Sequence, residues 1–168
     1  MSHFISPNAV MVEVLITASS GTTPGQTSFP EQQLLIDRPI VAIEAFCSMD
    51  FATSPLSANV PVIPVALFNS CFIQIMRSGN KASNQDAGLY FKNLPLSRLR
   101  YVQNNYTALN PSPSFSPGLF MVKPMFVQWP DTQIIFPTPQ AMGVPQYSIP
   151  FLVHFLLPNE AKALNINK

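Results

Sequence analysis

Proline interrupts this chain at short intervals, with 18 prolines spread along its 168 residues. The proline ring fixes φ and removes a backbone N–H donor, so proline disfavours helix interiors and the middle of a hydrogen-bonded sheet. No stretch of about a dozen residues combines helical periodicity with good helix formers and caps. The sequence therefore predicts many short strands joined by rigid turns.

The clearest predicted strand covers residues 10–17, where alternate positions are apolar and Glu13 lies on the opposite face. Residues 40–47 alternate in the same way, with Glu44 on the other face. Further strands are expected at 34–36, 60–68, 71–77, 88–92, 119–128, 133–136 and 148–157, and short helices only at 96–100 and 159–164. Eight or nine short strands are typical of a β-sandwich or closed barrel.

Two segments are expected to be long loops, because they are rich in Ser, Thr, Asn, Gly and Pro and show no periodicity: 19–30 and 103–117. No internal repeat and no shift of composition marks a second domain. We expect one domain over residues 1–168, with a short N-terminal arm (1–9) and a C-terminal tail (158–168).

Charge is scarce, because Asp, Glu, Lys and Arg make up only 10% of the chain and the net charge is +1. A usual share is about 25%. A folded protein with so few charges has little electrostatic protection against association, which favours a place inside an assembly. The alternative is a weakly charged monomer. The start of the chain lacks the pattern of a signal peptide, and we expect no transmembrane segment.

Catalytic groups are nearly missing from the sequence, so we predict no enzymatic activity, no cofactor and no metal site. The two histidines are His3, in the N-terminal arm, and His154, in an apolar strand. His154 is expected to be a histidine at the core edge with one hydrogen bond, and a role as a base is the alternative. Glu13 and Glu44 are candidates for an acid pair only if the fold brings them together.

The two cysteines, Cys47 and Cys71, adjoin apolar runs and are expected to be small buried residues, although a disulfide between them stays open. Five of the nine basic residues cluster in one region and form a predicted basic patch: Arg77, Lys81, Lys92, Arg98 and Arg100. A solvated rim is the simplest interpretation, and contact with nucleic acid, a membrane or an acidic neighbour is the alternative.

Some predicted strands are apolar on both faces, most clearly 151–157, which is interrupted only by His154. Either such a strand lies between two layers, or its second face meets another subunit. Together with the Pro/Ser/Asn-rich loops such as 54–59, the low charge and the polar arms, the pattern resembles the single jelly-roll coat or vertex proteins of tailless icosahedral viruses, particularly bacteriophages.

This resemblance implies a jelly-roll-like β-sandwich of about eight strands and a non-enzymatic virion protein, made in the host cytoplasm. Its expected role is a penton, vertex or minor capsid subunit that forms homo-oligomers, such as pentamers, and joins other capsid proteins. Aromatic residues are assigned to the subunit contacts: Phe4, Phe115, Phe120, Phe126, Trp129, Phe151 and Phe155.

Two other classes of function stay open. A β-sandwich binding module for glycans or a receptor predicts a monomer with aromatic side chains exposed on one face. A β-barrel enzyme predicts a pocket that gathers His154 with a carboxylate.

Overall fold

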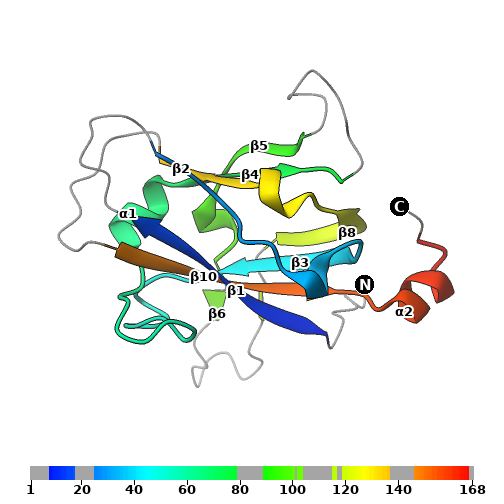
Figure 1. Cartoon of the computed structure of the whole chain (residues 1–168), viewed down its shortest axis with the longest axis horizontal. Coiled ribbons are helices and arrows are strands. Elements are labelled where there is room, and N and C mark those ends of the chain that lie inside the picture. Colours follow the sequence, from blue (N-terminus) through cyan, green and yellow to red (C-terminus); the bar gives the residue numbers. More distant parts are fainter. Residues whose placement is uncertain are drawn as a thin grey trace, which may run out of the picture.

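The computed structural model describes residues 8–17, 25–78, 89–100, 102–103, 115–116, 119–136 and 146–166. Eight strands form two four-stranded antiparallel sheets that pack as a sandwich (Figure 1). In spatial order, the first sheet contains β1 (Ala9–Thr17), β10 (Gln146–Phe155), β3 (Pro39–Ala45) and β8 (Leu119–Phe126). The second contains β2 (Gln26–Ser28), β9 (Gln133–Ile135), β4 (Phe72–Met76) and β5 (Leu89–Pro95).

The strand pairs are nested along the sequence. β1 pairs with β10, β2 with β9, β3 with β8, and β4 with β5, all antiparallel. A long two-stranded ribbon of this kind, rolled so that β10 also pairs with β3 and β9 with β4, is a jelly roll. The predicted all-β, jelly-roll-like sandwich is thus confirmed.

Alternation along the strands builds the core between the sheets. In β1, Val12, Val14 and Ile16 are buried, and Glu13 lies on the outer face, as predicted. β10 contributes every second residue from Ile149 to Phe155, and these pack with buried residues of β4 and β9. Each fully buried large apolar side chain of this kind contributes about 1.5–3 kcal/mol relative to an exposed one.

Two predicted strands are wrong. Residues 34–36 belong to a turn of 3-10 helix, η1 (Gln33–Leu35), which buries only Leu35. Residues 60–68 divide into an extended piece and the helix α1 (Val65–Ser70), whose N-cap residue is Pro64. Proline at 61 and 64 cannot donate to a ladder, so the apolar run cannot continue as one strand.

The predicted short helices are confirmed as η3 (Leu96–Arg98) and α2 (Pro158–Ala163). A further 3-10 turn, η4 (Trp129–Asp131), joins β8 to β9. Most of the predicted tail is folded: Ala161 of α2 packs with Val41 of β3 and with Leu156, which lies between β10 and α2, and Ile166 packs against this cluster. The carboxylate of Glu160 accepts hydrogen bonds from Leu157 N–H (2.6 Å) and from the side-chain amide of Asn8 (3.1 Å).

Three short strands lie in or beside the predicted loops. β2 consists of polar residues and carries no apolar signal, yet it pairs with β9. β6 (Val102–Gln103) and β7 (Phe115–Ser116) pair with each other at the two ends of the second loop. Of the two predicted loops, residues 19–24, 104–114 and 117 fall outside the described residues. Within the part described, no helix has the length and apolar character needed to cross a membrane.

Candidate functional site

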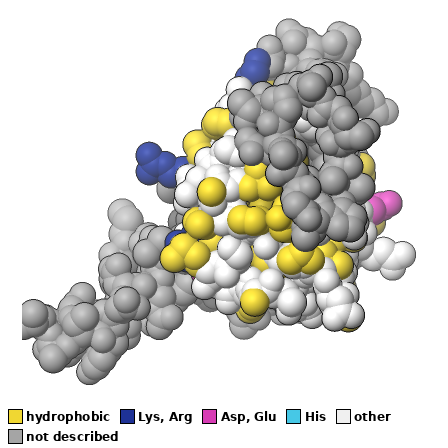
Figure 2. Space-filling view, turned by 90° about the vertical axis from the view of Figure 1, so that its left-hand side faces the viewer, with side chains coloured by type: hydrophobic (Ala, Val, Ile, Leu, Met, Phe, Trp, Pro, Cys, Tyr) yellow, Lys and Arg dark blue, Asp and Glu magenta, His cyan; other side chains and the backbone are white. Residues whose placement is uncertain are grey.

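One end of the sandwich carries no charge over a long stretch of chain. Residues 51–76 contain no Asp, Glu, Lys or Arg. They include the segment between β3 and α1, and α1 itself, on the left of Figure 1. Seen from that side, hydrophobic side chains gather in the middle of the face, with the few charged ones at its margins (Figure 2). We call the surface formed by Met49, residues 51–70 and the adjoining Leu15 of β1 the charge-free end; Asp50, paired with Arg100, lies at its margin.

Large apolar side chains of the charge-free end are exposed to solvent. The exposed fraction is 66% for Met49, 54% for Leu56 and 37% for Leu15. These three come from two segments that are distant in sequence, and β1 and residues 54–57 are joined through Glu13. The exposed apolar surface is therefore assembled by the fold.

Hydrogen bonds hold the segment 48–64 in one conformation. The hydroxyls of Ser54 and Ser57 donate to the two carboxylate oxygens of Glu13. Ser54 Oγ in turn accepts the backbone N–H groups of Leu56 (3.1 Å) and Ser57 (2.9 Å). Ser148 of β10 bonds through its backbone to Pro61 and to Ile63, each at 2.9 Å. The surface presented by this segment is thus preorganised.

The pKa of Glu13 reflects this network. Partial burial raises the pKa, but hydrogen bonds from Ser148, Ser54 and Ser57 outweigh it and hold the pKa below its ordinary value of 4.5. The hydroxyl of Ser148 lies near the carboxylate but reaches no hydrogen bond of good geometry with any described group. We therefore attribute the anchoring of the segment mainly to Ser54 and Ser57.

Glu13→Gln is expected to lower the free energy of unfolding by about 1 kcal/mol at neutral pH, because the amide replaces one of two acceptor oxygens with a donor. The pKa of Glu13 is lowered in the folded protein, so the ionised carboxylate stabilises the fold. This stabilisation is fully present above pH 4.5 and is lost as the pH falls through the folded-state pKa. Urea unfolding between neutral and acidic pH measures this, with the exposed Glu31→Gln as control. The role given to Glu13 would be contradicted if wild type and Glu13→Gln differed in free energy of unfolding by the same amount at acidic and at neutral pH.

The predicted basic patch is only partly assembled. Arg77 lies over the ring of Tyr90, with 6.0 Å between the guanidinium carbon and the ring centroid. Arg98 and Lys92 are exposed, and Lys81 lies outside the described residues. Arg100 is paired with Asp50 at 3.2 Å, which corrects the expectation that it belongs to an uncompensated patch. The two residues are 50 positions apart, so the sequence could not show their contact.

His154 and Glu44 form a pair on the outer face of the first sheet. His154 Nε2 lies 3.0 Å from Glu44 Oε2, and the two side chains are 13% and 8% exposed. Nδ1 of His154 is buried and has no hydrogen-bond partner among the described groups. The expectation of a core-edge histidine with one hydrogen bond is confirmed.

Glu13 and Glu44 do not act as a pair in this fold. They lie on β1 and β3, on opposite sides of β10, where Glu13 faces Pro150 and Glu44 faces Leu152 in the register. Each carboxylate has its own partner, the serine hydroxyls for Glu13 and His154 for Glu44. Within the described part of the chain, no three His, Cys, Asp or Glu side chains group as metal ligands would.

Three aromatic residues assigned to subunit contacts belong to the chain's own core. Phe151 is completely buried, and Trp129 and Phe155 are 3% and 7% exposed, so their assignment to an interface is wrong. The part of β10 from residue 151 onward is apolar on both faces except at His154, and the sequence could not show which face points inward. Phe126 is half-buried and lines a cleft. The side chains of Phe115 and Phe120, and the whole of Phe4, lie outside the described structure.

Both cysteines are free and buried, as predicted for small apolar side chains. Burial raises the pKa of the Cys71 thiol to about 12, and its Sγ donates to the carbonyl of Leu67 at 3.2 Å. Burial also raises the pKa of Cys47. Neither thiol is activated as a nucleophile.

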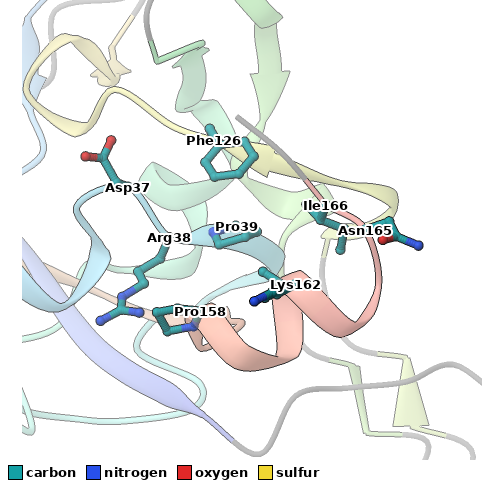
Figure 3. Close-up of a pocket in the computed structure, with 9 residues that line it drawn as sticks. Asp37, Arg38, Pro39, Phe126, Pro158, Lys162, Asn165 and Ile166 are labelled. Carbon is teal, nitrogen blue, oxygen red and sulfur yellow. The ribbon is translucent and has the colours of Figure 1, made fainter.

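A cleft of about 340 Å³ lies at the opposite end of the sandwich, between α2 and the start of β3 (Figure 3). We call it the α2 cleft. Its apolar walls come mainly from Pro39, Phe126, Pro158 and Ile166. Charged and polar side chains at the same cleft are Asp37, Arg38, Lys162 and Asn165.

The strand order and nested pairing define the chain as a jelly-roll β-sandwich. Comparison with known proteins finds no matching family model, curated protein or solved structure. The fold and its two ends are therefore the basis for a functional proposal.

Proposed function

We propose that this protein is a non-enzymatic structural subunit that self-associates through its charge-free end and builds into a larger protein shell. The observation that carries the proposal is an ordered surface on which Leu56 is exposed within a stretch of 26 residues, 51–76, without charge, and on which Met49, just before that stretch, is exposed as well. The cores of protein interfaces are depleted of charged residues, and methionine is enriched there. Contiguous exposed apolar surface commonly marks such sites.

The proposed setting is a virion, with the chain as a penton, vertex or minor coat subunit. The jelly roll is a fold of viral coat domains, but it also occurs in lectins and cupins, so fold alone does not decide. In a closed ring of five copies, the charge-free end of one copy would contact a different surface of the next, a head-to-tail contact. A stable contact of this kind buries about 800 Å² on each partner.

The alternative, a β-sandwich binding module for glycans or a receptor, expects an exposed aromatic platform. Within the described chain, the large apolar side chains that are exposed are aliphatic: Leu15, Leu34, Ile36, Met49, Leu56 and Leu164. This composition favours protein contact over sugar stacking.

A charge placed at the charge-free end is expected to weaken self-association. Leu56→Glu and Met49→Glu should each raise the dissociation constant about tenfold or more, since a carboxylate would have to lose its water in the contact. Light scattering across a wide range of protein concentrations measures this. Both side chains are more than half exposed, so the variants should fold.

The matched control is Leu34→Glu. Leu34 is about as exposed as Leu56, at 58%, but it belongs to η1, which lies away from the charge-free end. The residues that follow it, 36–38, line the cavities of that other region. It is expected to leave association unchanged. A wild-type chain that stays monomeric at all concentrations would overturn self-association and favour the binding module. Equal weakening by Leu34→Glu and Leu56→Glu would show that the contact lies elsewhere.

A further inference from the structure

The α2 cleft has two walls whose positions are held by the backbone. The N–H of Leu156 donates to Pro39 O at 2.9 Å, which ties the chain before α2 to the first residue of β3. After α2, Asn165 adopts a left-handed conformation with φ of 55°, and Ile166 N–H donates back to Ala161 O at 2.9 Å. Ile166 packs against the small cluster of Val41, Leu156 and Ala161. The cleft is thus a formed feature of the fold.

Two cationic side chains line the cleft, Arg38 just before β3 and Lys162 from α2. The guanidinium of Arg38 lies beside Pro158, whereas the Asp37 carboxylate points away from it (Figure 3). Neither cation has a carboxylate partner among the described residues. The nearby Glu160 carboxylate is engaged by Leu157 N–H and Asn8. The three charged side chains lining the cleft, Asp37 included, carry a net charge of +1.

We propose that the α2 cleft binds a monocarboxylate with a short apolar body. The two cations would hold the carboxylate, because hydrogen bonds between ionised partners are about twice as strong as neutral ones. Phe126, Pro39 and Ile166 would cover the apolar part. The volume of about 340 Å³ is at the lower end of ligand pockets, which suits a small molecule.

Hexanoate is the probe for this site, and binding is followed by the backbone amide resonances of the intact, ¹⁵N-labelled chain. We expect saturable shifts at Arg38, Lys162 and Ile166, with a dissociation constant on the order of millimolar, as suits a ligand of few atoms. Hexanol tests the apolar body without charge, and inorganic phosphate tests the anion without the apolar body. The dissociation constant of each of these two probes is expected to be at least about ten times that of hexanoate.

Arg38→Gln and Lys162→Gln are expected to weaken hexanoate binding about fivefold or more each, a loss typical of one charge-assisted hydrogen bond. Lys162 is exposed, so its variant should fold even if Arg38→Gln does not. Arg98→Gln, an exposed cation in η3, is the control and should leave binding unchanged.

Hexanol that binds as well as hexanoate, or binding that is insensitive to Lys162→Gln, would overturn the proposal. Phosphate that binds better than hexanoate would also overturn it, and would assign the cations to a different oxyanion. None of these outcomes bears on self-association through the charge-free end, which is measured separately by light scattering.

Discussion

Replacing Phe151 by alanine is expected to lower the free energy of unfolding by about 3–5 kcal/mol, among the largest losses for a single core substitution. Phe151 is completely buried on β10, the strand between β1 and β3. Its ring packs on Phe29, with 4.7 Å between centroids. The truncation would lose the favourable free energy of burying the aromatic ring. It would also leave a cavity that the flanking strands are poorly placed to fill.

Urea unfolding monitored by circular dichroism measures this loss. The matched control is Leu152→Ala, one position further on the same strand, where the side chain is half-buried on the outer face. It is expected to cost about 1 kcal/mol. If Phe151→Ala proved no more destabilising than Leu152→Ala, but weakened self-association, Phe151 would be an interface residue after all.

The second large effect concerns His154 and Glu44. His154→Leu should lower the free energy of unfolding by about 3 kcal/mol or more, because it leaves the buried Glu44 carboxylate without its hydrogen-bond partner. The double variant His154→Leu with Glu44→Leu is expected to regain most of that loss. Removing both polar partners avoids an unpaired buried group, and such replacements are often neutral.

A double-mutant cycle at neutral pH, with Glu44→Leu as the second single variant, gives the coupling energy of the pair. A coupling of at least about 1 kcal/mol is expected for groups in direct contact. Additive single effects would show that the 3.0 Å contact contributes little. The same variants bear on function, since the proposed structural role predicts that the double variant still assembles.

The two ends of the sandwich differ in the chemistry of the surface that they present. The charge-free end presents aliphatic surface on a segment anchored by Glu13. The α2 cleft lies at the other end and carries Arg38, Lys162 and Asp37. Both ends are open to the separate tests given above.

Local patterns in the sequence determined the class of fold. Alternation in residues 10–17 and the spacing of 18 prolines predicted short strands and little helix, because side-chain direction in a strand has a period of two and proline excludes long helices. The buried cysteines and the core-edge His154 followed from the apolar residues around them. Where local signals conflicted, as at 60–68, or were missing, as in the polar β2, the prediction failed.

Contacts between distant segments were decided only by the tertiary structure. The pairing of β1 with β10 brought Glu13 to Ser54 and Ser57, and the fold brought Asp50 to Arg100. The choice of inward face on β10 made Phe151 a core residue. A sequence that is apolar on both faces of a strand permits either orientation. The nested pairing selects one, because only one register lets both sheets bury their apolar faces against each other.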